Sequence, residues 1–322
     1  MPEHVSVLLN EVLAFARDAE ANSIDGDFTV LDATLGLAGH SRAILQQCNV
    51  NFLYGYDQDA EARKIAERNL ANFSGKFKIF PHNFSQIVEL MDTPFFNGLN
   101  FILFDLGVSN LQLVEVERGF SFVNNGPLDM RMNQSNAKIR TAADILNGSS
   151  VKELTEIFRA FGEEKYAHNI AKAIDRKKQN GFVFKTTYEL VDVIRQTLPQ
   201  AIQRHSGGHP ARRVFQALRI AVNCEMDVLK EALSSAFDLL RAHGILCVIS
   251  YHSLEDRIVK NAMRVKEAEC VGICKPRKAI TPTENEMEKN YKSRSAKMRV
   301  FVRYDKTEEK EARENVMASF PY

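Results

Sequence analysis

Several patterns that mark common functional classes are missing from this chain. The five cysteines are scattered, and the single close pair, Cys270 and Cys274, has neither a second pair nor a histidine pair to complete a zinc site. No apolar run approaches the roughly 20 residues of a membrane span. The first residues resemble neither a secretory signal nor an Arg- and Ser-rich leader. We therefore expect no metal site, thiols in a reducing compartment, and a soluble cytoplasmic protein.

One turn has the pattern of a nucleotide-binding site. The apolar, β-prone run Phe28–Leu31 ends at Asp32, and Gly36 and Gly39 precede a helix that opens at Ser41. A strand, a glycine turn and a helix N-terminus in this order can hold a nucleotide-like cofactor, because glycine lets the backbone approach the ligand. An ordinary βα turn with a capping acid is the alternative.

A second acid strengthens the cofactor interpretation. The next apolar run, 52–56, ends at Asp57, 21 positions after Gly36. This is close to the roughly 20-residue offset of an acid that binds ribose hydroxyls. NAD and S-adenosylmethionine both stay open at this point. The Gly-x-Gly-x-x-Gly spacing of a dinucleotide site is absent, which argues against NAD.

Predicted strands and helices alternate over the first third of the chain. After a helical pattern that begins near Leu8, the predicted strands are 28–34, 52–57, 77–80 and 100–106, and the helices between them are 41–48, 60–70 and 85–91. Such alternation predicts an α/β fold with a parallel, doubly wound sheet. From Gly107 to Asn147 no clear strand follows, and helices are predicted at 151–161, 164–179 and 187–198. We expect these to form a helical insertion.

The sheet is predicted to resume after a hinge-like break at 206–210. Residues 213–241 have the pattern of one long helix or two, and a strand at 244–250, a helix at 253–265 and a last strand at 298–304 follow. The stretch 270–293 is polar and is expected to be irregular. The charged tail from Asp305 is expected to fray.

Charge is unevenly distributed although the net charge is only +1. Residues 1–104 contain seven Lys and Arg against 13 Asp and Glu, whereas residues 257–303 contain 13 against five. Residues 130–220 are also basic, with 16 against eight. A basic surface beside a cofactor site suggests a phosphate-rich substrate, although solvated helix faces account for part of the pattern.

Polar residues follow two later strands, at the sheet edge where ligands bind in open α/β folds. Asp105 ends the strand 100–106, and Gln112 lies close after it. His252 follows the strand 244–250 and could accept a proton or bind phosphate, because imidazole titrates near neutral pH. Capping of turns and helices is the alternative for Asp105 and for the Ser253–Asp256 segment.

Arginines stand in segments that are not plain helix faces. Because its planar fork binds two oxygens at once, arginine suits phosphate. Phe120, Phe122 and Tyr251 offer stacking faces for an unstacked base, with core packing as the alternative. The arginines in question are Arg131, Arg212, Arg213, Arg257, Arg294 and Arg299.

Together these segments resemble a known family over residues 4 to about 303. It is the bacterial small-subunit ribosomal RNA cytosine-N4 methyltransferase family, MraW/RsmH. The matching motifs are His4-Val5-x-Val-Leu-Leu-x-Glu11, Asp32-x-Thr34-x-Gly36-x-x-Gly39-His40-Ser41, Asp105-Leu-Gly-Val-Ser109-x-x-Gln112-Leu113, Arg118-Gly-Phe-Ser-Phe122, Gly126-Pro-Leu-Asp-Met-Arg-Met132, Phe161-Gly-Glu-Glu164, His209-Pro-Ala-x-Arg213-x-Phe-Gln-Ala-Leu-Arg219, His252-Ser-Leu-Glu-Asp-Arg257 and Arg294-Ser-x-x-x-Arg299.

The resemblance implies a cofactor, a substrate and a set of site residues. The cofactor is S-adenosylmethionine, and the substrate is a cytidine in the decoding region of 16S ribosomal RNA on the small subunit. Asp105 and His252 are the candidate catalytic residues, and we expect RNA contacts from Arg118, Arg131, Arg213, Arg257 and Arg294. The expected cofactor-binding residues are Gly36, Ala38, Gly39, His40, Asp57, Phe84, Asp105 and Gln112.

The resemblance also implies a Rossmann-like methyltransferase sheet with a helical substrate domain inserted after the fourth strand. We expect methyltransferase segments at 1–112 and 209–304, the insertion at 113–208 and a charged tail at 305–322. Ala38 stands where the family usually has Gly and would place a methyl group in the cofactor turn. Together with departures at 110–114, this leaves an alternative: an inactive small-subunit assembly factor that binds RNA with the same fold. A related enzyme acting on another RNA or on a protein is a further alternative. The oligomeric state is left open.

The absence of two motifs further restricts the type of methyl transfer that we expect. Methylation at C5 of cytosine needs a Cys nucleophile, commonly in Pro-Cys, and many methyltransferases of exocyclic amines have Pro-Pro-Tyr/Phe; neither occurs here. We expect direct attack of N4 on the sulfonium methyl without a covalent enzyme intermediate. Asp105, or a backbone carbonyl near Gly107, would orient the amine, and positioning would supply most of the acceleration.

Overall fold

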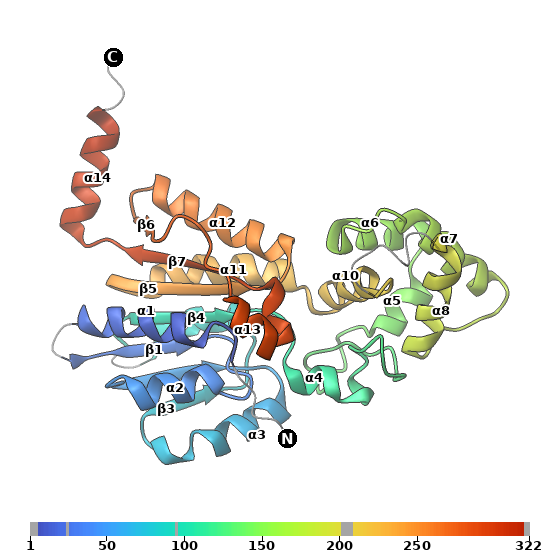
Figure 1. Ribbon diagram of the computed structural model, residues 1–322, viewed down its shortest axis with the longest axis horizontal. Coiled ribbons are helices and arrows are strands. Elements are labelled where there is room, and N and C mark those ends of the chain that lie inside the picture. Colours follow the sequence, from blue (N-terminus) through green and yellow to red (C-terminus); the bar gives the residue numbers. More distant parts are fainter. Residues whose placement is uncertain (1–5, 24–25, 94–95, 201–208, 319–322) are drawn as a thin grey trace. The chain divides into compact units, whose positions relative to one another are not determined.

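The computed structural model describes residues 6–23, 26–93, 96–200 and 209–318. The chain forms two compact units, whose elements are labelled in Figure 1. We call them the sheet unit, which contains the residues up to Gly107 and from Met226 onward, and the helical unit, Val108–Glu225. His4 and Val5 of the first motif and residues 206–208 of the predicted hinge lie outside the described residues. Over the described ranges, no helix is long and apolar enough to cross a membrane.

A seven-stranded sheet organises the sheet unit, with strand order β3-β2-β1-β4-β5-β7-β6. The first five strands in this order are parallel, and β7 and β6 are antiparallel to their neighbours. The strands are β1 (Thr29–Asp32), β2 (Phe52–Tyr56), β3 (Phe77–Phe80), β4 (Leu99–Asp105), β5 (Leu240–Ser250), β6 (Gly272–Cys274) and β7 (Lys297–Arg303).

Helices cover both faces of this sheet, which is why its central strands are apolar throughout. Alternate side chains of β4 enter different cores: Phe101 and Leu103 pack on the side of α1, α2 and α3, and Ile102 and Phe104 on the side of α11, α12 and η3. The helices of this unit are α1 (Leu9–Ala21), α2 (Gly39–Gln47), α3 (Ala60–Asn69), α11 (Glu225–Leu239), α12 (Ser253–Ala268), α13 (Glu284–Lys289) and α14 (Lys306–Ala318), with 3₁₀ turns η2 (Ala71–Phe73), η3 (Phe84–Asp92) and η5 (Tyr291–Ser295).

The helical unit has an apolar core of its own, with Phe158, Phe184 and Leu218 fully buried. Several of its helices begin at a side chain that caps their free N–H groups; α6, for example, begins after Ser150, which exchanges hydrogen bonds with Glu153. The helices are α4 (Asn110–Val114), η4 (Val116–Arg118), α5 (Ala142–Gly148), α6 (Val151–Gly162), α7 (Ala167–Gln179), α8 (Thr187–Thr197) and α10 (Arg212–Asn223).

The predicted α/β fold with a helical insertion is confirmed, whereas several details differ. Of the two possibilities for 213–241, the structure has two helices, which are separated at Cys224, a left-handed residue with φ 51°. The stretch 270–293 is not irregular, because it contains β6 and α13, which are too short to produce a periodic pattern. The tail does not fray from Asp305 but forms α14, whose first turn is supported by Asp305.

The unit boundaries also differ from those expected. The structure divides the chain after Gly107 and after Glu225, whereas the sequence placed the boundaries after residues 112 and 208. The second difference has a packing cause, since α10 packs on α6 and α5 and its apolar face belongs to the core of the helical unit.

Candidate functional site

Three acidic residues lie at, or directly after, the carboxyl ends of neighbouring strands. We call this end of the sheet the acidic edge. Asp32 ends β1, Asp57 comes directly after β2, and Asp105 ends β4. Because β2, β1 and β4 are adjacent and parallel, their carboxyl ends meet at the same edge. The cluster is therefore a consequence of topology, and it brings together two of the acids that the sequence assigned to the cofactor site, Asp57 and Asp105.

Asp57 is fixed by two backbone donors. The N–H of Gly36 donates to Oδ2 and the N–H of Asp59 to Oδ1, each at 2.8 Å. Burial raises the pKa of Asp57 to about 7, although these two hydrogen bonds favour the ionised form. Each carboxylate oxygen has one such donor and can accept a further hydrogen bond, as a pair of ribose hydroxyls requires.

The turn after β1 uses left-handed backbone at two positions. Gly36 has φ 53°, and Ala38, the residue before α2, has φ 63°. Ala38 is fully buried and belongs to the apolar core on the α1 side of the sheet. The methyl group that we expected to intrude into the cofactor turn is thus held inside the core and is inaccessible to a ligand.

Gly39 and His40 hold the segment that precedes α1. A side chain at Gly39 would collide with the Ser6 hydroxyl. The buried His40 ring donates from Nε2 to the Val7 carbonyl at 2.9 Å, and its Nδ1 lies 3.7 Å from Oδ2 of Asp105. Burial lowers the pKa of His40, so the ring is neutral at physiological pH. The contacts of both residues in the structure are thus with other residues of the chain. Their contacts with the cofactor stay predictions.

Asp105 is held through both its backbone and its side chain. Its backbone N–H donates to Oγ1 of Thr34 at 2.6 Å, and its Oδ1 accepts from the Tyr251 hydroxyl at 2.7 Å. Its side chain is 25% exposed, so the carboxylate can still reach a ligand. Burial, together with the charge of Asp105, raises the pKa of Tyr251 well above its usual value. The phenol therefore remains a hydrogen-bond donor throughout the working pH range.

Lys292 lies in the electrostatic field of the same carboxylate. Burial lowers the pKa of this lysine to about 8, and the charge of Asp105 opposes the decrease. Lys292 is in η5, within the polar stretch whose sequence has no periodic signal, and sequence reasoning missed it. Thr34 and the Tyr251–Asp105 hydrogen bond were missed too, because finding that bond requires knowing that β4 and β5 are neighbours.

Phe84 and Gln112 are the remaining residues predicted for the cofactor site. Phe84 is half-buried at the start of η3 and meets Phe104 edge-to-face, with 5.7 Å between ring centres. Gln112 is in the helical unit, where its side chain accepts from the backbone N–H of Ser109 in a capping box. Its predicted cofactor contact stays a prediction.

His252 acts as the cap of α12, whereas the sequence offered a cap as the alternative for the Ser253–Asp256 segment. Its Nδ1 accepts from the backbone N–H of Glu255, and its Nε2 lies 3.0 Å from a carboxylate oxygen of Glu255. The ring is thus engaged in holding the helix N-terminus. This arrangement favours a structural role over the predicted catalytic one.

The five arginines predicted to contact RNA differ in exposure. Arg118 is only 5% exposed and donates to the carbonyls of Arg131 and Met132, which argues against its predicted RNA contact. Arg131 is held by Asp129 through two hydrogen bonds of 2.8 Å. Arg213, Arg257 and Arg294 are exposed.

No disulfide links the five cysteines, which are all free. One group in the described part of the chain, His243 with Asp305 and Glu308, has the residue types of a metal site. Its side chains are partly exposed, and the two acids lie 3.6 and 3.5 Å from the imidazole nitrogens. It does not involve Cys270 and Cys274, the close pair in the sequence.

Comparison with known proteins assigns the chain to a family. The family model described as the MraW methylase family matches residues 1–304. The chain belongs to the MraW methylase family. Among curated relatives, Ribosomal RNA small subunit methyltransferase H 2 of Agathobacter rectalis is 40% identical over 322 residues, covering 94% of this chain and 99% of that protein. Ribosomal RNA small subunit methyltransferase H of Persephonella marina is 42% identical over 312 residues, covering 94% and 100%.

S-adenosylmethionine is the methyl donor of this family member. The residues at the sheet edge fit it. Asp57 has free acceptor capacity for ribose hydroxyls, Phe84 offers an apolar face for the adenine, and the acidic edge complements the positive charge of a sulfonium. When bound, the cofactor supplies an electrophilic methyl group.

Proposed function

We propose that this chain methylates N4 of a cytidine in the decoding region of 16S ribosomal RNA on the small subunit. The membership of the MraW methylase family and the names of the curated relatives support ribosomal RNA as the substrate. The motif resemblance across residues 4 to about 303 supports the cytosine amine. The observation that carries the chemistry is the ordered carboxylate of Asp105, held by Tyr251 at the acidic edge of the sheet.

The chain's own residues have distinct tasks in this reaction. The Asp105 carboxylate accepts a hydrogen bond from the exocyclic amine and directs the nitrogen lone pair toward the methyl group. Tyr251 fixes the position of Oδ1, and Thr34 fixes the backbone of Asp105. As the new N–C bond forms and the bond between the methyl group and sulfur breaks, the amine would release one proton to the Asp105 carboxylate, which passes it to solvent. The rest of the acceleration comes from holding the two reactants in line.

RNA contacts in this proposal come from the exposed arginines. Arg213, Arg257 and Arg294 each present a guanidinium at the surface, and two of them lie in the basic stretch 257–303. Guanidinium groups bind phosphate oxygens in pairs. The contacts of Arg118 and Arg131 within the chain give these two a supporting role for the segment between η4 and α5.

An inactive assembly factor is the alternative function. Two sequence features supported this alternative, and one of them was a methyl group from Ala38 in the cofactor turn. Because that methyl group is fully buried in the core, it gives no reason for the loss of cofactor binding. The other feature is the set of differences from the family pattern at 110–114, which lie in the helical unit.

Methyl transfer to purified small subunits tests the proposal. The protein is incubated with radiolabelled S-adenosylmethionine and small subunits that lack the modification, and the labelled nucleotide is mapped on the RNA. We expect about one methyl group per subunit at a cytidine of the decoding region. Label elsewhere, or cofactor binding without any transfer, contradicts the proposal, and the second result supports the assembly factor.

A further inference from the structure

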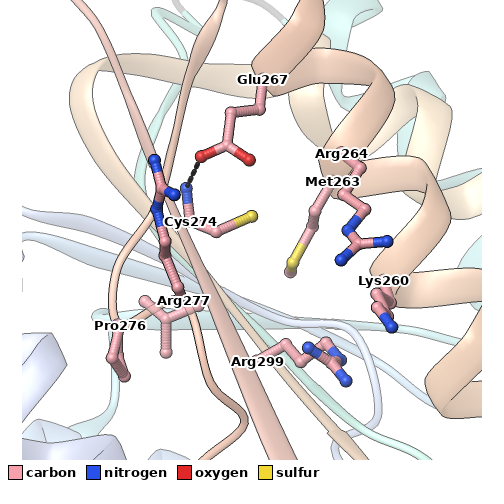
Figure 2. Close-up of a pocket in the computed structure, with 9 residues that line it drawn as sticks. Lys260, Met263, Arg264, Glu267, Cys274, Pro276, Arg277 and Arg299 are labelled. Atoms are coloured by element: carbon pink, nitrogen blue, oxygen red, sulfur yellow. Dashed lines mark hydrogen bonds between the residues drawn. The ribbon is translucent and has the colours of Figure 1, made fainter.

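A pocket of about 180 Å³ lies between α12 and the β6–β7 edge of the sheet. Figure 2 shows its cationic side chains, with Lys260 and Arg264 on α12 facing Arg277 and Arg299 across the opening. Glu267 is the one acidic residue of the lining. The volume corresponds to roughly six water molecules at about 30 Å³ each, so a group larger than a single water can enter.

The charges in this pocket are only partly compensated within the protein. Arg299 donates to both carboxylate oxygens of Asp256, at 2.6 and 3.2 Å. Glu267 accepts from the backbone N–H of Cys274 at 3.3 Å. Within the described residues, no hydrogen bond or ion pair engages the side chains of Lys260, Arg264 or Arg277.

The thiol of Cys274 is part of the same lining as these cations. Burial and the charge of Glu267 raise the pKa of that thiol, whereas the charges of Arg299, Arg264 and Arg277 lower it. Arg264 is on α12, Arg299 is on β7 and Arg277 follows β6, so three guanidinium groups from separate segments border one pocket. Like charges held together repel one another, and an anion placed between them removes that cost.

The positive surface continues from the pocket along α12. Arg257, Lys260 and Arg264 follow at intervals of three and four residues and so lie on one face of the helix. A row of cations that leads out of a pocket matches a ligand with several phosphates in a chain. A single small anion would occupy the pocket and would not contact the cations outside it.

We propose that this pocket binds a backbone phosphodiester of the RNA substrate, with Arg264, Arg277 and Lys260 as its ligands. The proposal rests on the proposed function, which supplies the RNA. The pocket is at the β6–β7 edge, which β5 separates from β4 and Asp105. It therefore anchors the RNA at a point outside the methyl-transfer site, as phosphate contacts do when they set position and not sequence.

Salt-dependent binding of the full-length protein to unmodified small subunits tests the pocket. The variant carries Arg264→Gln and Arg277→Gln, and the matched control is Arg313→Gln, an exposed arginine on α14, whose described residues are net acidic. We expect the double variant to bind about tenfold more weakly at low salt. Its log Kd should depend less steeply on log salt, by about one unit per lost contact, and the control should match wild type.

Two further readouts separate a phosphate anchor from other roles. With the double variant, KM for small subunits should rise while kcat at saturation and the affinity for S-adenosylmethionine stay unchanged. In wild-type protein, small subunits should slow alkylation of Cys274, with Cys48 as the reference thiol.

A double variant that matches Arg313→Gln in affinity and salt dependence overturns the pocket proposal while leaving the proposed function intact. Protection of Cys274 by inorganic phosphate but not by small subunits overturns it as well, because the pocket then binds a free anion. Wild-type protein that binds small subunits without methylating them contradicts the proposed function alone, and wild-type protein that does not bind them contradicts both.

Discussion

At the scale of single residues, the site depends on how Asp105 is held. Its carboxylate is partly exposed, and the residue is positioned by Tyr251, directly after β5, and by Thr34 from the turn after β1. Because the backbone and the carboxylate are each held by a hydrogen bond, little freedom is left to lose when the carboxylate engages a substrate amine. In the proposed mechanism the carboxylate has only to orient the amine and accept one hydrogen bond, so no strong general base is required.

Replacing this carboxylate should affect turnover more than cofactor binding. Asp105→Asn keeps an acceptor for Tyr251 but removes the charge, and we expect kcat to fall about 100-fold. Tyr251→Phe removes only the positioning hydrogen bond, and we expect a decrease of about tenfold. The measurement is single-turnover methylation of small subunits, with Asp92→Asn, an exposed acid of η3, as the control. Full turnover in Asp105→Asn with normal cofactor affinity would remove Asp105 from the mechanism.

Asp57 predicts a pH dependence for cofactor binding. Its pKa of about 7 in the free protein means that the carboxyl is half protonated near neutrality. Ribose hydroxyls donate to the ionised form, so the affinity for S-adenosylmethionine should increase as pH rises from 6 to 8. Asp57→Asn should bind about 10- to 100-fold more weakly, because charge-assisted hydrogen bonds are lost, and should show little pH dependence over this range. Calorimetric titration at each pH measures both effects; equal pH dependence in the two proteins argues against the ribose role.

The same shift fixes the sign of the effect on stability. The pKa of Asp57 is raised in the folded state from its usual value of 3.8. The folded state therefore binds the proton more tightly, and its contribution is present below about pH 4 and is lost as pH rises to about 7. Across that window the stability of the wild type should fall relative to Asp57→Asn, as urea unfolding at several pH values would measure.

At the scale of elements, one side chain of α10 ties a motif-rich loop to its helix. Asn223 accepts from the backbone N–H of Met132 and donates to the carbonyl of Met130, both at 2.8 Å. Met130 is left-handed with φ 62°, so this stretch cannot continue as a regular strand or helix. The geometry of the loop is thus maintained by an amide that lies about 90 residues further along the chain.

Removing this amide should destabilise the helical unit. In Asn223→Ala, the two loop backbone groups lose their partners, and we expect a cost of about 2 kcal/mol. The measurement is the urea midpoint followed by circular dichroism. Gln179→Ala, which removes an exposed amide at the end of α7, is the control and should change the midpoint little. Equal midpoints for the two variants would contradict the proposed role of Asn223.

Elements with a strong local pattern were predictable, and those defined by tertiary contacts were not. The run 100–106 is apolar at nearly every position, which identifies a strand buried on both faces, and β4 is that strand. By contrast, β6 has three residues and exists only because β7 pairs with it. The helix η3 has a helical apolar pattern, and its 3₁₀ geometry could not be read from that pattern.

The site residues that could be predicted from the sequence are those at the ends of strands. Asp57 and Asp105 each follow an apolar run, so their positions at the sheet edge follow from parallel topology alone. Tyr251 and Lys292 approach Asp105 only after the chain has passed through the helical unit and returned. The burial of Ala38 could not be foreseen either, because it depends on which side of the turn its methyl group points to.

At the scale of the whole molecule, both charged features of the site lie in one of the two compact units. The sheet unit contains the acidic edge and the basic pocket beside α12, so one compact unit presents opposite charges at two places. The acidic edge complements a cationic cofactor, and the basic pocket complements RNA phosphates. Such a separation keeps the cationic side chains that would bind RNA away from a cationic cofactor, which they would repel.

The central claim is that the methyl group is transferred to the exocyclic nitrogen of cytosine without covalent attachment of the enzyme to the base. The most direct test is nucleoside analysis of small-subunit RNA methylated by this protein with deuterated S-adenosylmethionine, using chromatography and mass spectrometry. The account predicts that the deuterated methyl group appears in N4-methylcytidine. Its appearance in 5-methylcytidine, or in any nucleoside other than a cytidine methylated at N4, would contradict the account.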